Sequence, residues 1–363
     1  DSHPNQPAYI AFSSGTTGKP RAILGSLRPL AHFWHWQCHT FNLSSDDQFS
    51  MLSGLAHDPL LRDLFTPIVA GGTLHIPSTT TLYDGKALAA WLTNRQISIS
   101  HLTPALAQIL ATAAPAVNTL RHLFVGREPL TQTAVSQLST LAPNANIHNA
   151  YGTTETPQIM AIPAATNGLS QTVAPLGQGI DGVQLLILTP DLRLAGVGEL
   201  GQIAVRSPYL ADGYLDNETL TQQKFIPNPF IDQPDPVDRL YLTGDNGRFL
   251  PNGDVQFVGR NDGQINLRGF RIELADIEAA LTSPPAVHRA VVTLQDDQLI
   301  GYVVGDPTDQ TQLLAHLRQY LPSYMLPNAV IPLSQIPLTP NGKIDHAALP
   351  NPTPKQPTTQ ATN

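Results

Sequence analysis

Short apolar runs alternate with segments of helical apolar spacing along the first part of the chain. Residues 8–12 are an apolar run that predicts a short buried strand. Residues 58–70 carry apolar side chains at helical spacing, and the Gly-Gly-Thr-Leu-His-Ile-Pro segment that follows predicts a turn and a strand. The order strand, helix, strand recurs over residues 97–126. This alternation favours an α/β architecture with a largely parallel sheet.

The pattern changes after residue 180. Short apolar runs separated by turn residues predict an antiparallel sheet or a distorted barrel up to residue 260. A strand is then expected at residues 265–273 and a helix at 274–281. A pair of strands at 288–294 and 299–305 and an amphipathic helix at 311–321 should follow. We therefore expect a large core over residues 1–261, a small C-terminal α/β domain over 262–350, and a disordered linker over the apolar-poor residues 351–363.

Composition narrows the class of protein without identifying it. The 363 residues are 41% hydrophobic, as in folded chains, and the formal net charge of -8 argues against nucleic-acid binding. Cys38 is the only cysteine, which excludes an intrachain disulfide and a zinc–thiolate cluster and fits a reducing cytoplasm. Because no apolar stretch reaches the ~18 residues of a membrane span, no membrane partner is expected.

A Gly/Ser/Thr loop with the sequence Ser-Ser-Gly-Thr-Thr-Gly-Lys-Pro follows the first expected strand, at residues 13–20. Glycines let several backbone N–H groups point at one anion, and hydroxyls add donors, so the loop suits a polyphosphate. It is not a Walker loop, because the spacing before Lys19 is too short and Pro20 stands where a magnesium-binding hydroxyl would be. Taken alone, the same residues also fit a plain turn.

The loop resembles the phosphate loop of the adenylate-forming, or AMP-binding, superfamily, and later segments resemble that family in the same order. They are Tyr151-Gly152-Thr153-Thr154-Glu155, Tyr241-Leu242-Thr243-Gly244-Asp245, Gly259-Arg260-Asn261-Asp262, Arg268-Gly269-Phe270-Arg271-Ile272-Glu273 and Pro340-Asn341-Gly342-Lys343-Ile344-Asp345. The chain resembles the amino-acid adenylation domains of nonribosomal peptide synthetases. The resemblance implies an adenylate-forming fold: a large multi-sheet domain with a β-barrel-like part, plus a small mobile C-terminal domain.

By this resemblance the chain is an AMP-forming ligase that uses ATP and Mg²⁺. A carboxylate oxygen attacks the α-phosphate of ATP and pyrophosphate leaves, a reaction in which fixed cations and donors supply most of the catalysis. The acyl group then passes to the phosphopantetheine thiol of a peptidyl carrier domain, expected downstream in the same polypeptide. The resemblance assigns ATP binding to Ser14, Gly15, Thr16, Thr17, Gly18, Lys19, Tyr151, Gly152, Thr154, Asp245, Arg260 and Arg271.

Individual residues receive roles from the same resemblance. Tyr151 would stack on adenine, Asp245 would accept hydrogen bonds from both ribose hydroxyls, and Arg260 would help to hold that sugar. Glu155 would bind Mg²⁺, which prefers oxygen ligands.

The resemblance also assigns the chemical step and the conformational step. Lys343 would bridge the substrate carboxylate and the α-phosphate, although a surface lysine in an Asn-Gly turn is the alternative for this residue alone. Asp262 would be the hinge about which the small domain turns after the adenylate has formed.

Residues 55–65 resemble the pocket helix of the family and indicate an amino acid as substrate. Asp58 stands where amino-acid-activating members keep a carboxylate for the α-ammonium group, with helix capping as its alternative role. His57 stands at the aromatic position that closes over the reacting carboxylate, and it joins Lys343 as a catalytic candidate. The other pocket positions are Pro59, Arg62, His101, Phe124, Gly126, Ala150, Gln158 and Ile159.

Arg62 and His101 make this pocket more polar than one for Phe or Leu. One hypothesis is that Arg62 pairs with a carboxylate or amide of the substrate. The alternative, weighed equally, is that Arg62 pairs with Asp63 or faces solvent. Because Pro59 can shift the start of the helix, a β-amino acid is also an open alternative for the substrate.

The sequence also departs from the family. The phosphate loop begins at Ser13, where the family has a substantial preceding portion, so we expect an N-terminally truncated fragment with poor stability and weak activity. Arg127 interrupts a Gly-Gly-Glu segment that is frequent in the family, and His346 stands where the family usually has an arginine. Two other functions stay open at this point: an acyl-CoA ligase of the same superfamily, and a noncatalytic fragment.

Overall fold

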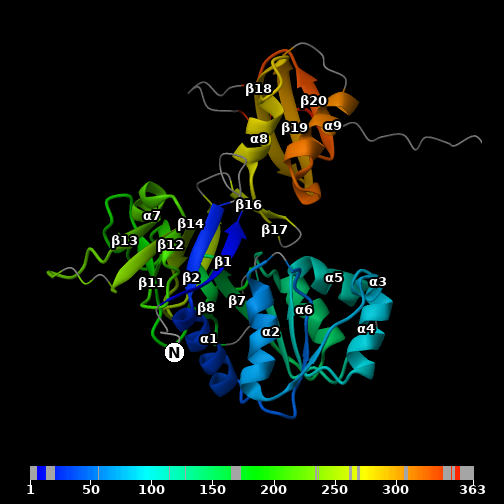
Figure 1. Cartoon of the computed structure of the whole chain (residues 1–363), viewed down its shortest axis with the longest axis vertical. Coiled ribbons are helices and arrows are strands. Elements are labelled where there is room, and N and C mark those ends of the chain that lie inside the picture. The colour runs from blue at the N-terminus through cyan, green and yellow to red at the C-terminus, as the bar shows by residue number, and fades with distance from the viewer. Residues whose placement is uncertain are drawn as a thin grey trace, which may run out of the picture. The chain divides into compact units, whose positions relative to one another are not determined.

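The computed structural model describes residues 6–13, 21–55, 57–113, 115–126, 128–164, 173–233, 235, 237–260, 264–267, 270–305, 310–337, 345 and 348–351. These residues divide into two compact units. The first holds the described residues up to Arg260 together with residues 266, 267, 270 and 271, and the second holds those from Ile272 onward together with Gln264 and Ile265. Figure 1 shows the elements of each unit.

The main sheet of the first unit has the strand order β4-β3-β5-β6-β7-β8-β9. Its strands are β3 (Gln48–Ser50), β4 (Thr73–His75), β5 (Ile99–Leu102), β6 (His122–Gly126), β7 (Asn146–Thr153), β8 (Thr156–Ile162) and β9 (Gln178–Gly179). The pairings from β4 to β7 are parallel, and those of β8 are antiparallel. The expected largely parallel α/β sheet is therefore confirmed.

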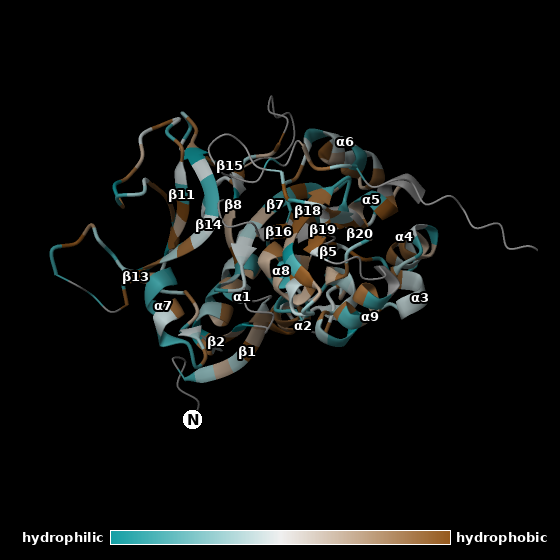
Figure 2. Ribbon diagram, turned by 90° about the horizontal axis from the view of Figure 1, so that it is seen from above, coloured by the Kyte–Doolittle hydropathy of each residue, from teal (hydrophilic) through white to brown (hydrophobic). Residues whose placement is uncertain are grey.

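Helices cover both faces of this sheet. They are α1 (Leu27–Thr40), α2 (Pro59–Ala70), α3 (Thr79–Leu82), α4 (Gly85–Asn94), α5 (Pro104–Ala113) and α6 (Gln132–Leu141). Alternation along β6 separates the layers: Phe124 packs with the apolar residues of α1, whereas Leu123 and Val125 pack with those of α4 and α6. Bands of polar and apolar residues along α4 and α6 show the same amphipathic arrangement (Figure 2).

Local sequence signals set where several helices begin and end. Asp84 caps α4 by accepting hydrogen bonds from the backbone N–H groups of Lys86 and Ala87, both at 3.0 Å. Pro59 opens α2, where the missing N–H is not needed. The same helix ends at Gly71, whose φ of 74° is left-handed and suits glycine.

A smaller sheet with the order β1-β2-β12 contains β1 (Pro7–Ser13), β2 (Arg21–Ser26) and β12 (Gly213–Tyr214). The strand expected at residues 8–12 is present, but the expectation that it is buried is wrong. Ile10 and Phe12 are 48% and 57% exposed, Ala11 is buried, and Tyr9 is partly buried against the core. The reason is that β1 lies at the edge of this sheet.

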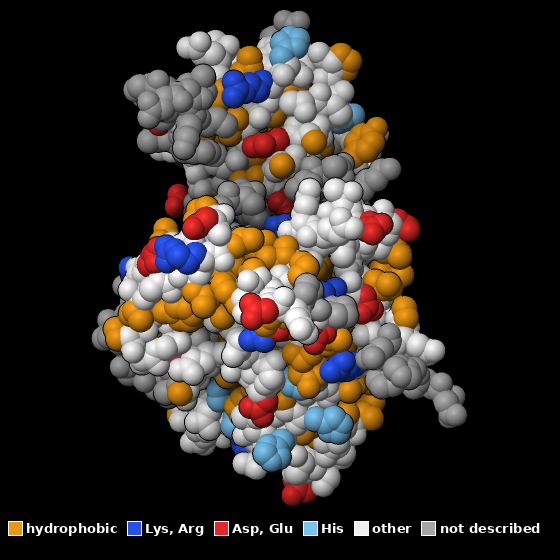
Figure 3. Space-filling model, turned by 90° about the vertical axis from the view of Figure 1, so that its left-hand side faces the viewer, with side chains coloured by type: hydrophobic (Ala, Val, Ile, Leu, Met, Phe, Trp, Pro, Cys, Tyr) orange, Lys and Arg blue, Asp and Glu red, His pale blue; other side chains and the backbone are white. Residues whose placement is uncertain are grey.

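The expected antiparallel region is confirmed. It contains β10 (Gln184–Leu188), β11 (Gly201–Arg206), β13 (Phe225–Pro227), β14 (Arg239–Phe249), β15 (Val255–Arg260) and helix α7 (Glu218–Lys224). Every strand pairing within the sheet β10-β11-β14-β13, and that of β15 with β14, is antiparallel. On the face that Figure 3 shows, apolar side chains gather over a broad area of the first unit.

The single strand expected over residues 265–273 is wrong. The structure has two paired strands there, β16 (Gln264–Leu267) and β17 (Phe270–Glu273). Gly269 lies between them in the sequence, and glycine weakens the interior of a strand.

The second unit is a small α/β body, as expected. Its elements are α8 (Leu274–Thr282), β18 (Val287–Gln295), β19 (Gln298–Gly305), α9 (Gln310–Tyr320), the 3-10 helix η1 (Ser323–Met325) and β20 (Ala329–Leu333). Strand β19 pairs antiparallel with β18 and parallel with β20, and Val291, Ile300 and Tyr302 lie in the core. Among the described residues of both units, no helix has the length and apolar content that a membrane crossing needs.

Candidate active site

A cavity of about 510 Å³ lies within the first unit. Its wall is formed by the start of α2, by the carboxyl ends of β5, β6 and β7, and by parts of β14 and β15. Clefts at the carboxyl ends of parallel strands are the usual ligand sites of open α/β sheets. The cavity therefore lies where the sheet topology alone would place a ligand.

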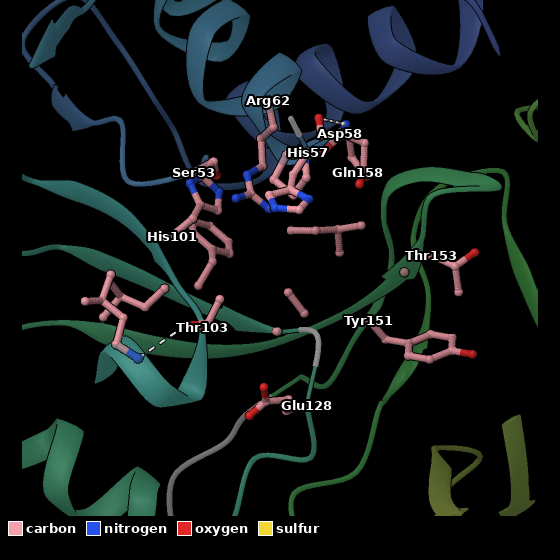
Figure 4. A pocket seen from close by; sticks show the side chains of 18 of the residues that line it. Ser53, His57, Asp58, Arg62, His101, Thr103, Glu128, Tyr151, Thr153 and Gln158 are labelled. Carbon is pink, nitrogen blue, oxygen red and sulfur yellow. Dashed lines mark hydrogen bonds between the residues drawn. The ribbon is translucent and has the colours of Figure 1, made fainter. Parts of the chain in front are cut away.

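Both groups of predicted site residues line this one cavity. The substrate positions on its wall are His57, Asp58, Pro59, Arg62, His101, Phe124, Gly126, Ala150, Gln158 and Ile159. The nucleotide positions on its wall are Tyr151, Gly152, Thr154, Asp245 and Arg260. Figure 4 shows Arg62, His57, Asp58 and Gln158 along one side of the cavity, with Tyr151 and Thr153 farther round its wall.

The nucleotide end is organised around the carboxylate of Asp245. The hydroxyl of Tyr151 donates to its Oδ2 at 2.7 Å, and Arg260 pairs with its Oδ1. Arg260 faces Asp245 across the β14–β15 ladder and also donates from Nη2 to the carbonyl oxygen of Thr243 at 3.2 Å. Burial, strengthened by the charge of Asp245, raises the pKa of Tyr151 well above its ordinary value, so the phenol stays a donor.

The substrate end begins at the first turn of α2, where Asp58 is held from two sides. Thr154 Oγ1 donates to Asp58 Oδ1 at 3.2 Å, and Gln158 Nε2 donates to the Asp58 carbonyl oxygen at 3.1 Å. The side chain of Asp58 makes no capping bond, and its backbone is already helical. The capping alternative is therefore wrong, and the carboxylate lies on the cavity wall instead.

Arg62 lies one helical turn farther along α2. Its Nε donates to Asp63 Oδ1 at 3.0 Å, and its side chain, 14% exposed, still lines the cavity. The pairing with Asp63 that was weighed as an alternative is therefore present, together with a position on the wall. His57 also lies on the wall, with its ring 5.1 Å from that of Phe270 in an edge-to-face arrangement.

Glu155 is the predicted residue that the structure does not bring to the cavity. It is fully buried and accepts a hydrogen bond on Oε1 from the hydroxyl of Tyr214 at 2.8 Å. Among the described residues, no group of three or more His, Cys, Asp or Glu is placed to hold a metal ion. This arrangement of Glu155 does not fit a ligand of ATP-bound Mg²⁺, so its metal role stays a prediction and no step below depends on it.

Other predicted residues lie outside the described part of the chain. They are Ser14, Gly15, Thr16, Thr17, Gly18, Lys19, Asp262 and Lys343, and for Arg271 only the backbone is described. Their assigned roles stay predictions.

Several cavity residues were not singled out from the sequence. Glu128, Thr153, Phe257 and Phe270 line the cavity wall. Behind the wall, Gln37 of α1 is completely buried and bonds the ring of His101. The sequence contains a feature that could have indicated Gln37: it is a polar residue on the face of α1 that otherwise carries buried apolar side chains such as Phe33.

Comparison with known proteins agrees with this geometry. Residues 1–215 match the model of the AMP-binding enzyme family, and residues 276–343 match that of the AMP-binding enzyme C-terminal domain. The chain is 36% identical to an L-2-aminoadipate reductase of Schizosaccharomyces pombe, covering 96% of this chain and 29% of the reductase. It is 33% identical to a dimodular nonribosomal peptide synthase of Bacillus subtilis, covering 96% of this chain and 15% of the synthase.

The solved structures agree as well. A nonribosomal peptide synthetase protein that contains adenylation and PCP domains matches with a TM-score of 0.84 and 27% identity, over 95% of this chain and 60% of that one. The Vibrio cholerae adenylation domain AlmE, in complex with glycyl-adenosine-5'-phosphate, matches with a TM-score of 0.84 and 22% identity, over 94% and 66% of the two chains. The predicted adenylate-forming fold and AMP-forming ligase class are thereby confirmed. The chain belongs to the AMP-binding enzyme family, as an adenylation domain of the adenylate-forming superfamily.

Proposed function

We propose that this chain activates an amino acid as an aminoacyl-adenylate at the expense of ATP. One observation carries the proposal: a single cavity joins the Asp58 end to the Tyr151–Asp245–Arg260 end. A ligand with an ammonium group and a ligand with a ribose can then be held in one space. Holding two reactants side by side supplies much of the rate in such a reaction.

The residues of the cavity have distinct tasks in this proposal. Asp58 accepts the α-ammonium group of the amino acid in a charge-assisted hydrogen bond. Asp245, fixed by Tyr151 and Arg260, accepts the ribose hydroxyls through its remaining lone pairs. The substrate carboxylate oxygen then forms a bond to the α-phosphorus while the bond to pyrophosphate breaks. Lys343 offsets the charge that develops on the phosphate oxygens.

We infer that Arg62 recognises the side chain of the substrate and that this side chain ends in a carboxylate or an amide. The Nε of Arg62 is bonded to Asp63, whereas its side chain still lines the cavity. Relatives that are 33–36% identical over nearly the whole chain are L-2-aminoadipate reductases, whose name specifies an amino acid with a second carboxylate. The chain spans less than a third of the length of these relatives, so the activity of a longer protein is part of the proposal.

Transfer of the acyl group to a carrier domain completes the proposed cycle. The solved relatives that contain adenylation and PCP domains support it, as does the predicted hinge at Asp262. The phosphopantetheine thiol of a carrier domain would form a thioester with the acyl carbon while the acyl–phosphate bond breaks and AMP leaves.

Exchange of labelled pyrophosphate into ATP tests the first step. A panel of amino acids, fatty acids and aryl acids should support exchange with an amino acid and with none of the other acids. Exchange with fatty or aryl acids alone, followed by CoA thioester formation, would establish the acyl-CoA ligase alternative instead. Absence of exchange with every acid would favour a noncatalytic fragment.

A further inference from the structure

The inner faces of α1 and α2 carry polar residues where a core would ordinarily be apolar. Gln37 of α1, Asp63 and Thr66 of α2, and His101 of β5 are all buried. Buried polar groups cost free energy unless each one is hydrogen-bonded, and an apolar core of the same shape would avoid that cost. His101 is part of the cavity wall, and the other three residues do not line the cavity.

Asp63 is the centre of this buried group. Its Oδ2 accepts the backbone N–H of Ser53 at 3.1 Å, and its Oδ1 accepts Arg62 Nε at 3.0 Å. The side chain of Asp63 is entirely inaccessible to solvent. His101 Nδ1 lies 3.6 Å from the same Oδ1. The carboxylate is therefore held by a backbone group on one side and directs two side chains on the other.

The bonds behind His101 fix which of its nitrogens carries the proton. Gln37 Oε1 accepts the hydroxyl of Thr66 at 3.3 Å, so the amide nitrogen of Gln37 faces His101 Nε2 at 2.8 Å. An amide N–H can only donate, so Nε2 accepts and Nδ1 carries the hydrogen on the side of Asp63. Burial, aided by the charge of Arg62, holds the pKa of His101 well below its usual range, and the ring stays neutral.

Arg62 is consequently anchored at one edge only. Its Nε is bonded to Asp63, and among the described residues no hydrogen-bond partner is found for its two terminal nitrogens. The guanidinium is planar, so fixing Nε fixes the plane in which the terminal N–H groups point. A carboxylate is recognised best when two parallel N–H groups meet both of its oxygens, which requires that plane to be set in advance.

We propose that Asp63 is a positioning residue that sets the guanidinium of Arg62 for a carboxylate at the end of the substrate side chain. The bonds among His101, Gln37 and Thr66 orient the Nδ1–H of His101 toward Oδ1 of Asp63, at 3.6 Å. This inference rests on the proposed function, because it presumes that an amino acid occupies the cavity. It goes beyond that function by assigning the selectivity to a residue that does not line the cavity.

Direct binding to the full 363-residue chain tests the inference without requiring catalysis. Calorimetry would give the dissociation constants of L-2-aminoadipate and of L-norleucine, which has the same carbon skeleton without the second carboxylate. Asp63→Asn has one acceptor oxygen where two are used, and Arg62→Lys keeps the charge but loses the bonded Nε. Asp238→Asn is the matched control, because Asp238 pairs with Arg206 at 2.7 Å outside this cavity.

The wild-type chain should prefer aminoadipate, and Asp63→Asn and Arg62→Lys should each lower that preference by roughly tenfold, the loss expected for a charged hydrogen bond. The dissociation constant of ATP, measured by the same calorimetry, should stay constant, which a general loss of structure would not allow, and thermal unfolding confirms that each variant is folded. If Asp63→Asn does not fold, Arg62→Lys alone decides.

An unchanged or increased preference in a folded variant would overturn the inference, because Asp63 would then merely compete with the substrate for Arg62. Equal binding of the two amino acids by the wild-type chain would overturn it as well. Failure of pyrophosphate exchange with every amino acid, by contrast, would count against the proposed function while leaving the binding comparison intact.

Discussion

Asp245 shows how a buried carboxylate can be both satisfied and available. Its pairing with Arg260 offsets the cost of burying its charge, and the phenol of Tyr151 holds the other oxygen. A carboxylate oxygen can accept more than one hydrogen bond, so the proposed binding of the ribose hydroxyls does not require Tyr151 or Arg260 to leave Asp245. Removing Arg260 would leave the charge uncompensated, which is why the pair acts as one unit.

Asp58 should matter for the amino acid and not for ATP. Asp58→Asn keeps the shape and an acceptor oxygen for Thr154 but removes the charge that an ammonium group requires. Loss of one charge-assisted bond of about 2–3 kcal/mol predicts a rise of roughly 30- to 150-fold in the KM for the amino acid, with the KM for ATP unchanged. Pyrophosphate-exchange kinetics with each substrate varied in turn would measure both. Equal rises in both KM values would contradict the assigned role.

At this scale the order of residues along the chain located several residues of the cavity wall, whereas the direction of a side chain did not follow from that order. Asp58, Tyr151 and Asp245 occupy the expected cavity because their positions follow from the strands and helix that carry them. Glu155 follows directly after Thr154, yet its carboxylate turns inward to Tyr214. The direction depends on a partner nearly sixty residues away, which no local pattern specifies.

At the scale of elements, neighbouring strands align a row of rings beneath the cavity. The parallel register places His101 of β5 beside Phe124 of β6, and Phe124 beside His148 of β7. Their rings stack with centroids 4.7 and 4.8 Å apart, and His122 Nδ1 lies 3.0 Å from His148 Nε2. The sheet thus ties the position of a cavity residue to a ring two strands away.

This row should make the stability of the first unit depend on pH. Burial, with a contribution from the neighbouring His122, lowers the pKa of His148 from 6.5 to about 4. Between these values the unfolded chain binds a proton that the native state excludes, so the stabilisation is complete above pH 6.5 and is lost as the pH falls toward 4. The loss from this one group is about 3 kcal/mol at most.

The variant His148→Phe should flatten that dependence. It retains a ring against Phe124 but removes the titrating group, so the free energy of unfolding should fall less steeply between pH 6.5 and 4 than in the wild-type chain. Denaturant unfolding at several pH values would measure the slopes. His35→Phe, on the exposed side of α1, is the control and should keep the wild-type slope. Parallel slopes for His148→Phe and wild type would contradict the assignment.

Helices and strands whose apolar residues recur at a clear period were predicted well, and elements without such a period were not. Helix α2 and the strands β5 and β6 lie where the apolar spacing indicated. Helix α1 was missed, because polar His32, His35 and Gln37 interrupt its apolar residues. The exposure of β1 could not follow from its apolar composition, since burial depends on which face of the sheet another element covers.

At the scale of the molecule, the described cavity residues and the residue predicted to carry the chemical step lie in different stretches of the chain. All described residues of the cavity belong to the first unit. The residue predicted to act on the α-phosphate, Lys343, belongs to the stretch of chain assigned to the second unit. The proposed function predicts that the cavity residues carry the affinity for both substrates and that Lys343 contributes mainly to the rate.

The variant Lys343→Ala tests this division. Calorimetric binding of the amino acid and of AMP should change little, because every described cavity residue is intact. Pyrophosphate exchange should fall by roughly 100-fold or more, since a fixed cation at the transferring phosphate is a major source of transition-state stabilisation. Lys86→Ala removes an exposed lysine of α4 and should alter neither measurement. Loss of binding in Lys343→Ala would place the lysine in ground-state recognition, and unchanged exchange would remove it from the chemistry altogether.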